Sequence, residues 1–247
     1  MKKRLLILGM IFTMVVSSAG CGSSSSDNAG KTDQTKQTAD VQDSQKDTSS
    51  SDKSDDKNDT SYKSADEITM DDLMSHDETS AEDFEFNDGA DEIVIQKYVG
   101  KDPIVVIPDE IDGKKVVGFE SAFTLNNNIV AVKIGNNVQE VENSAFSGCK
   151  QLKYVVMGDS VKTIGGRMFA QTNLQELVLN DGLQKIGQDD SNNVLAPPSS
   201  NCGMDLKIPE SVTELHVSEF NLIGKSGSYA EQYANEHADA GVTFTAE

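Results

Sequence analysis

The hydrophobic and polar positions between Val138 and Leu183 follow nearly the same order twice. The segment VQEVENSAFSGCKQLKYVVMGDS begins at Val138 and VKTIGGRMFAQTNLQELVLNDG begins at Val161, so the apolar positions return after 23 and then 22 residues. A repeat of this length is typical of a solenoid, in which each repeat forms one coil. A single coil cannot bury its own apolar side chains, so neighbouring coils are expected to stack around one shared core.

Each repeat contains an apolar triplet with the spacing L-x-x-L-x-L. The triplets are Leu152, Val155 and Met157, then Leu174, Leu177 and Leu179. Residues two apart face the same side of a strand, so the last two members of each triplet are predicted to lie on a short strand of a parallel stack. The opposite wall is predicted from an aliphatic residue followed five positions later by phenylalanine. These pairs are Val141 with Phe146 and Ile164 with Phe169.

Weaker copies of the pattern occur on both sides. In the first, Val105 and Ile107 are predicted to form the strand, Pro108 ends it, and Phe119 takes the aliphatic position four residues before its aromatic partner, Phe123. A second coil follows from Leu125. The residues predicted to form the repeat core are Val105, Ile107, Phe119, Phe123, Ile129, Val132, Ile134, Val141, Phe146, Cys149, Leu152, Val155, Met157, Ile164, Phe169, Leu174, Leu177, Leu179, Leu206 and Ile208.

The unit also resembles a known family. The order of Ala145, Phe146, Cys149, Leu152, Val155 and Val161 resembles the BspA-like (Treponema-type) class of bacterial leucine-rich repeats, whose unit reads roughly V-x-x-I-x-x-x-A-F-x-x-C-x-x-L-x-x-V-x-I-P-x-S. This resemblance implies a β-rich solenoid of coils of 22 to 23 residues with parallel β rungs. It also implies a surface-displayed binding or adhesion module.

Both ends of the repeat domain, predicted over residues 84–247, carry candidate caps. Residues 84–100 read as a β-hairpin that turns at Asn87-Asp88-Gly89 and covers the open end of the stack. The coils run over about 101–219. Residues 220–247 contain a predicted helix to about Ala240, with Ser228 and Glu231 as a capping box.

The repeat pattern fails after Ile186. The segment QDDSNNVLAPPSSNCGMD has no aromatic residue at the expected position, so residues 187–205 are predicted to form an irregular loop before Leu206 and Ile208 resume the pattern. Val194 and Leu195 are candidates to fill the vacant aromatic position. Loops that project from a repeat scaffold often bind ligands, but they also tolerate sequence drift.

The first residues resemble an export signal. Lys2, Lys3 and Arg4 precede an apolar run that is too short to span a bilayer comfortably, so residues 1–20 are predicted to be a lipoprotein signal peptide. Ser18-Ala19-Gly20-Cys21 resembles a lipobox, which implies a diacylglyceryl anchor on Cys21 and a position on the extracytoplasmic face of a bacterial membrane. The alternative is an ordinary secretory signal cut near Ala19, which leaves Cys21 as a free thiol.

Residues 21–63 are rich in Ser, Asp, Lys, Thr and Gln and are predicted to form a disordered tether. Residues 64–83 read as an acidic linker with a short helix, for which Ser64 and Glu67 form a possible capping box. A frayed helix in a solvated linker is favoured over a docking peptide. Residues 22–92 carry 21 acidic side chains against 6 lysines, which is most of the formal net charge of −20. This balance argues against nucleic acid as a partner.

No catalytic pattern is found. His76, His216 and His237 are scattered, and no zinc or phosphate-binding spacing occurs, so neither cofactor nor metal is expected. The acidic groups near Asp88 and Asp189 lack the spacing of a calcium loop and are interpreted as solvated turns. Cys149 and Cys202 are expected to be unpaired, because a rung lies between them.

The predicted function is therefore a non-catalytic, lipid-anchored module at the cell surface that binds an extracellular protein or glycan. The alternative is a structural or accessory protein of the cell envelope without an external ligand. A hydrolase would need convergent carboxylates, which the repeats do not show. The sequence does not identify the ligand or the oligomeric state.

Overall fold

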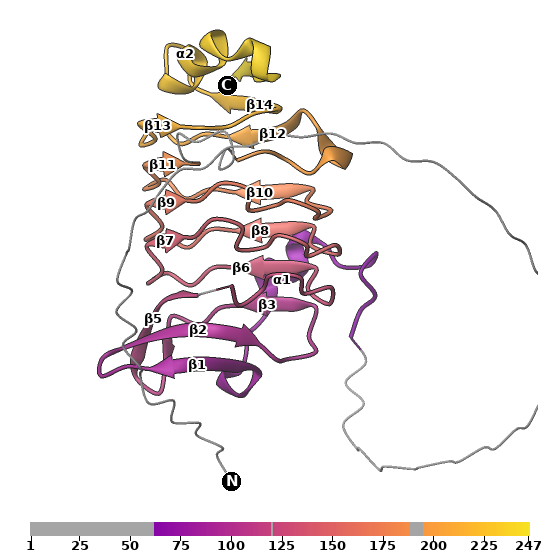
Figure 1. The fold of residues 1–247 in the computed structure, drawn as a ribbon, viewed down its shortest axis with the longest axis vertical. Coiled ribbons are helices and arrows are strands. Elements are labelled where there is room, and N and C mark those ends of the chain that lie inside the picture. Colours follow the sequence, from indigo (N-terminus) through magenta and orange to yellow (C-terminus); the bar gives the residue numbers. More distant parts are fainter. Residues whose placement is uncertain (1–61, 120, 188–194) are drawn as a thin grey trace, which may run out of the picture. The chain divides into compact units, whose positions relative to one another are not determined.

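The computed structural model describes residues 62–119, 121–187 and 195–247, and these residues form a stack of coils with two parallel sheets as its walls (Figure 1). The first sheet consists of β3 (Ile104–Val106), β6 (Ala131–Lys133), β8 (Tyr154–Val156) and β10 (Glu176–Val178). The second sheet consists of β7 (Glu140–Val141), β9 (Thr163–Ile164), β11 (Lys185–Ile186) and β13 (Glu214–Leu215). The predicted solenoid with parallel rungs is therefore confirmed.

The register of both sheets follows the repeat. Val105, Val132, Val155 and Leu177 are aligned across the first sheet. Val141, Ile164, Ile186 and Leu215 are aligned across the second. Each row consists of side chains buried between the walls, because equivalent residues of successive coils point to the same side.

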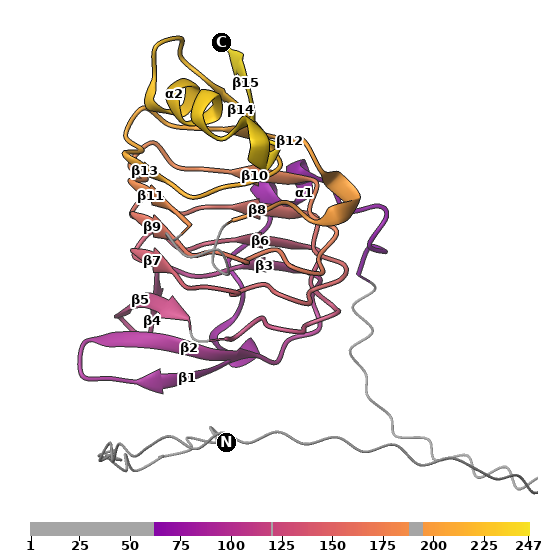
Figure 2. The same ribbon diagram turned by 45° about the horizontal axis from the view of Figure 1, so that its top comes forward.

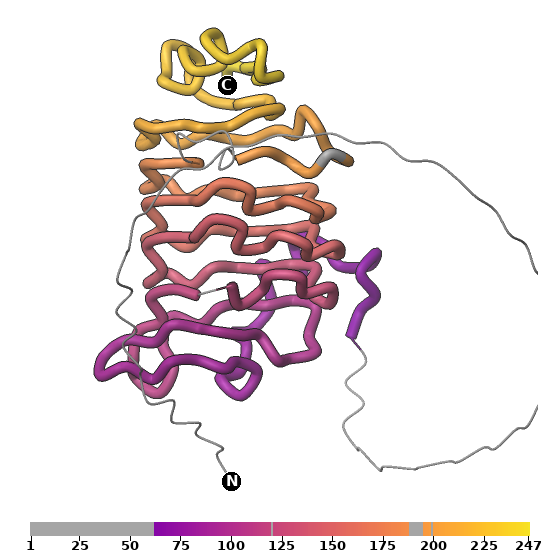
Figure 3. Tube along the Cα trace, viewed as in Figure 1, coloured from indigo at the N-terminus to yellow at the C-terminus, as the bar shows by residue number. Residues whose placement is uncertain are grey.

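The backbone conformation at the turns also repeats from coil to coil. The turn residues Ser121, Ser144 and Arg167 have φ of 51°, 60° and 52°. The coils also approach each other closely: a Cβ added at Gly158 or Gly165 would overlap backbone atoms of the preceding coil. Figure 3 shows the resulting even spacing of the windings along the stack.

Phenylalanines form a ladder through the core. The ring centroids of Phe119 and Phe123 are 5.3 Å apart, those of Phe123 and Phe146 are 5.5 Å apart, and those of Phe146 and Phe169 are 6.4 Å apart with an interplanar angle of 6°. All the side chains expected in the repeat core are buried except that of Leu179, which is partly buried. Leu179, which follows β10, is less buried because β10 is the last strand of its sheet and, among the described residues, has no paired strand on the side away from β8.

The N-terminal cap is the expected hairpin. β1 (Phe84–Asp88) and β2 (Glu92–Tyr98) pair as antiparallel strands. On its other edge β2 pairs in parallel with β5 (Lys114–Phe119), and β5 also pairs with β4 (Glu110–Ile111). A short 3-10 helix, Ala81–Asp83, precedes the hairpin. Phe84, Ile93 and Ile95 are buried, so the hairpin closes the apolar end of the stack.

The C-terminal cap is a fourth sheet, of β12 (Met204–Lys207), β14 (Phe220–Gly224) and β15 (Thr243–Ala246), packed against α2 (Tyr229–Glu236). The helix is shorter than predicted, because a separate 3-10 turn, Ala238–Ala240, follows it. Its expected capping box is half formed. The Ser228 side chain accepts a hydrogen bond from the Glu231 amide, but the Glu231 carboxylate accepts from the Gly227 amide instead of the Ser228 amide.

The irregular loop is described only in its second half. Leu195 is fully buried, and its amide donates to the His216 carbonyl at 2.9 Å. A 3-10 turn, Ser199–Asn201, then leads into β12. Val194, which was proposed with Leu195 to fill the vacant aromatic position, lies outside the described residues, as do Asp189 and Asp190.

The segment before the hairpin corrects the sequence interpretation. A short helix is present, α1 (Met70–Ser75), but its N-cap is Thr69, which forms a capping box with Asp72. Ser64 and Glu67 are hydrogen-bonded within a turn that precedes the helix. The favoured interpretation of a frayed helix in solvent is wrong, because Ile68 and Leu73 are buried against the first sheet.

Candidate functional site

The residues before the hairpin form a strap, defined here as 62–80, that lies across the outer surface of the first sheet (Figure 2). Leu73 of α1 is 0% exposed and Ile68 is 2% exposed. The two side chains belong to an apolar cluster with five side chains of the stacked coils. These five are Ile104, Val106, Val130, Ala131 and Val156. The strap therefore covers β3, β6 and part of β8.

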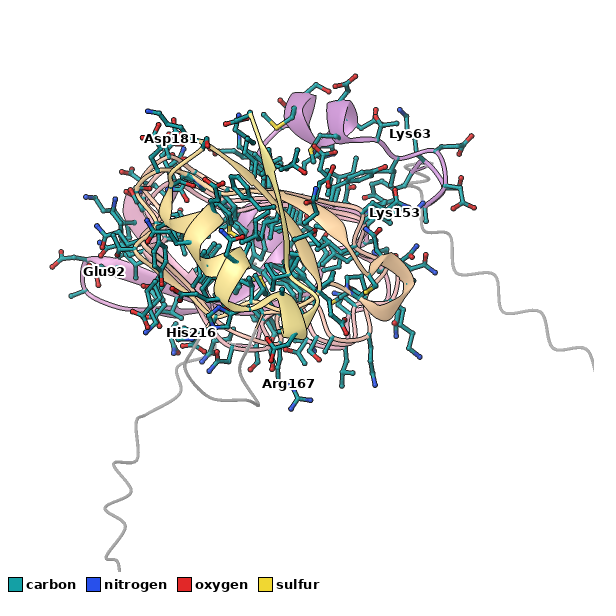
Figure 4. The ribbon with its side chains drawn as sticks, turned by 90° about the horizontal axis from the view of Figure 1, so that it is seen from above. Lys63, Glu92, Lys153, Arg167, Asp181 and His216 are labelled. Atoms are coloured by element: carbon teal, nitrogen blue, oxygen red, sulfur yellow. The ribbon has the colours of Figure 1, made fainter. Side chains whose placement is uncertain are left out.

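Polar contacts hold both ends of the strap. The Lys153 ammonium donates to the Ala65 carbonyl at 2.8 Å and to the Asp66 carboxylate at 3.1 Å. At the other end, the Thr79 amide donates to the Val106 carbonyl at 2.9 Å and the Thr79 hydroxyl accepts from the Val106 amide at 3.0 Å. Thr79 thus satisfies the edge of β3 that would otherwise be open. Figure 4 shows Lys63 and Lys153 beside the strap, with Arg167 and His216 on the opposite side of the coils.

The stack is interrupted beyond β10. β12 is the next strand in the stack, but β10 pairs with β8 and β12 pairs with β14, and no ladder joins β10 to β12 within the described residues. The 28-residue step from Glu176 to Met204, which contains the irregular loop, replaces the regular step of 22 or 23 residues. Asn201 bridges the gap at one end, where its amide nitrogen donates to the Leu174 carbonyl at 3.1 Å.

A groove of about 690 Å³ lies between β10 and β12. Leu177, Val178 and Leu179 contribute to its apolar surface from the β10 side, and Met204 and Ile223 contribute from the cap. Val178 is 39% exposed, although its register partner Val156 on β8 is only 7% exposed. Val178 therefore continues, uncovered, the row of Val106, Lys133 and Val156, of which the two valines belong to the apolar cluster under the strap.

The rim of this groove is acidic. Glu176 and Asp181 line it from the first sheet, and Asp205 lines it from β12. The one basic side chain among the lining residues, Lys207, is paired with Glu247 at 2.8 Å. Aromatic side chains are absent from the described residues that line the groove, whereas glycan sites commonly use aromatic rings as flat apolar platforms.

A second hollow is smaller. It has a volume of about 280 Å³ and lies beside the C-terminal cap, where Pro209 and Glu210 face the turn that starts α2. Lys225 and Glu210 are paired across it at 3.3 Å. Because the polar groups here are paired with each other, the larger groove is the better candidate for binding.

The histidines are not assembled into an active centre. His76 lies 3.4 Å from the Asp102 carboxylate, and His216 lies 3.1 Å from the Glu214 carboxylate. His237 stacks on Tyr233 with a centroid separation of 3.9 Å. The described residues contain no group of three or more His, Cys, Asp or Glu side chains that could hold a metal ion. Asp88, proposed to lie in a solvated turn, forms an ion pair with Lys114.

The two described cysteines are free and have different surroundings. Cys149 is fully buried, and its thiol donates to the Phe123 carbonyl at 2.8 Å. Burial raises the pKa of the Cys149 thiol to about 11. Cys202 is exposed and lies between Asn201 and Gly203, which line the groove.

Sequence reasoning located the break in the repeat but not the groove. The long step between Leu177 and Leu206 signalled an insertion, yet nothing in the pattern showed that β12 would pair with β14 in preference to β10. The buried strap was also missed, because its apolar residues are few and lie within an acidic segment.

The comparison with protein-family models agrees with the architecture. Residues 119–194 match the family model described as a BspA type leucine rich repeat region, with 6 copies. The crystal structure of a T. pallidum leucine-rich repeat protein is similar over 60% of this chain and 71% of that chain, with 29% identity and a TM-score of 0.49. None of the curated proteins compared with this chain matches it.

Proposed function

We propose that this chain, whose residues 119–194 are BspA type leucine-rich repeats, is a lipid-anchored module that binds a protein partner outside the cytoplasm. A leucine-rich repeat region suggests a protein-interaction module, and solenoids offer extended surfaces for this purpose. The anchoring follows from the lipobox-like sequence that ends at Cys21. In the described part of the chain, no helix has the length and apolar character needed to cross a membrane.

The observation that carries the proposal is the uneven covering of the first sheet. The chain's own strap seals β3 and β6, whereas Val178 on β10 stays exposed beside an open groove. An aliphatic surface next to unpaired strand edges is a surface on which a partner can pack. We favour a protein over a glycan, because the described groove residues include no aromatic side chain. The binding is proposed to be non-catalytic.

Site-specific photocrosslinking tests this function. A benzophenone amino acid placed at Val178 in the full chain is expected to form a covalent adduct with a protein supplied from outside the cell. The matched control is the same amino acid at Glu140, which is exposed on the second sheet. Equal labelling from both positions, or no adduct from Val178, would contradict binding at the groove.

The alternative is an accessory protein of the cell envelope without an external ligand. The strap favours it, because much of the sheet surface is already covered within the chain. This alternative predicts that the adduct from Val178 contains only a protein of the same membrane. An adduct with an external protein would exclude it.

The anchor is tested by changing Cys21. The Cys21→Ala variant cannot carry the thioether-linked lipid, so we expect it to leave the membrane fraction and appear in soluble form. Cys202→Ala is the control, because that thiol lies in the repeat domain. Retention of the Cys21→Ala variant in the membrane fraction would rule out lipidation as the anchor.

A further inference from the structure

The groove between β10 and β12 offers two strand edges that face each other without being paired. β10 has three residues and β12 has four, and both have their ladder partners on their far sides. An extended segment of about four residues spans about 13 Å, which matches strands of this length. Cα atoms of β10 and β12 come within 8 Å of each other, so no further strand fits between the two edges, and a bound segment would lie along the open side of the groove.

The strap shows how an added segment packs on this sheet. It places the aliphatic side chains of Ile68 and Leu73 over the first sheet, and Lys153 fixes it through one carbonyl and one carboxylate. Val178 stands beside Val156 in register, one strand beyond the covered area. An aliphatic side chain of a bound segment would cover Val178 in the same way.

Charge selects among the possible occupants. Glu176, Asp181 and Asp205 surround the apolar part of the groove, and the Lys207 charge is offset by Glu247. A second copy of this chain, with a formal net charge of −20, would be repelled by such a rim. A segment that carries lysine or arginine on either side of an aliphatic residue complements both the apolar surface of the groove and its acidic rim.

We propose that the groove between β10 and β12 binds an extended segment of a partner protein in which lysine or arginine residues flank an aliphatic side chain. This inference rests on the proposed function and specifies the chemistry of the partner. The aliphatic side chain packs on Val178, and the basic side chains lie beside Glu176 and Asp181.

A peptide pair tests the proposal. The probes are acetyl-Gly-Lys-Val-Lys-Val-Lys-Gly-amide and the same peptide with glutamate in place of lysine, each titrated into the full chain that carries Cys21→Ser. We expect the lysine peptide to bind and the glutamate peptide not to bind. The double variant Glu176→Lys/Asp181→Lys should weaken the lysine peptide at least about 10-fold and permit binding of the glutamate peptide.

The matched control is Glu140→Lys/Glu142→Lys, which changes the net charge equally on the second-sheet side of the coils. Equal weakening by both double variants would show non-specific attraction and overturn the proposal, as would failure of the lysine peptide to bind. Val178→Ala should weaken the peptide separately, because the aliphatic contact is lost while the charges remain. One further outcome is that photocrosslinking from Val178 captures a partner while the affinity of the lysine peptide is unchanged in Glu176→Lys/Asp181→Lys. In that case the proposed partner chemistry is wrong and the interaction function stands.

Discussion

At the scale of single residues, the phenylalanine ladder stabilises the coils by joining them to one another. Phe146 lies within 5.5 Å of the Phe123 ring and 6.4 Å of the Phe169 ring, measured between centroids, so it contacts a coil on each side. Its side chain is fully buried, as is that of Phe169. Loss of such a ring leaves a cavity that two adjacent coils would have to close together.

Replacing Phe146 or Phe169 with alanine is therefore expected to lower the free energy of unfolding by about 3 to 5 kcal/mol. Denaturant melting of the full chain measures this change. Val99→Ala is the control, because Val99 is 43% exposed and the substitution should cost less than about 1 kcal/mol. A loss below about 1 kcal/mol for either phenylalanine would mean that the ladder does not form the core.

The two thiols of the repeat domain should react differently. The pKa of Cys149 is raised to about 11 by burial, so its thiol stays protonated at pH 8 and is also out of reach of reagents. In the native chain carrying Cys21→Ser, we expect a disulfide reagent at pH 8 to modify one thiol, that of Cys202. The second should react only after denaturation. Two equally fast thiols in the native chain would place Cys149 at the surface.

At the scale of elements, α1 shows how tertiary packing stabilises a helix that is too short to stand alone. A helix of six residues is well below the length at which isolated helices are stable in water. Two features compensate: Leu73 is buried on the first sheet, and the Thr69 capping box satisfies the first amides of the helix. The element depends on its neighbours for most of its stability.

The cap gives this element a pH dependence. The pKa of Asp72 is lowered from 3.8 to about 2, first by the hydrogen bond from the Lys63 ammonium and then by the bonds with Thr69. Because the folded pKa lies below the ordinary value, the carboxylate stabilises the strap above pH 4, and this contribution is lost as the pH falls toward 2. Titration of the Asp72 carboxyl carbon by NMR should show the low pKa. Lys63→Ala should raise it more than Thr69→Ala does, and an unchanged value in both variants would contradict these contacts.

The strap itself should be removable without loss of the solenoid. Leu73→Asp places a charge in a fully buried position, so we expect residues 62–80 to detach from the sheet. Cleavage by a protease within the strap should then become on the order of 10-fold faster or more, and the Val106 amide should exchange faster because it loses Thr79. Met74→Asp is the matched control, since Met74 is 54% exposed on the same helix. Equal cleavage of the two variants would show that the strap is not held by Leu73.

At the scale of the whole molecule, the order of the parts along the chain fits a display function. The lipid anchor predicted at Cys21 and the predicted tether precede the strap in the sequence, and the strap leads into the hairpin cap. A flexible chain of some forty residues has a root-mean-square span of roughly 35 Å, which would hold the repeat domain away from a membrane surface. The two caps close the apolar ends of the stack, so the groove beside Val178 is the place where the regular stacking is left incomplete.

The sequence by itself determined the solenoid, because the same spacing of apolar positions recurs from coil to coil. Phe146 and Phe169 recur with Val141 and Ile164 at constant spacing, and residues that recur at the coil period must stack on their equivalents. The hairpin and the capping helix were also readable, since turn and cap signals are local. The export signal and tether are sequence predictions of the same local kind.

Only the tertiary structure decided where the surface is covered and where it is open. The burial of Leu73 depends on Val106 and Val156, which lie far away in sequence, so no periodicity around Leu73 could reveal it. The groove likewise depends on a choice between two pairings of β12, and β12 pairs with β14 of the cap. Local patterns specify which residues are apolar enough to be buried. Which segment covers each of these surfaces is decided by packing between segments that are distant along the chain.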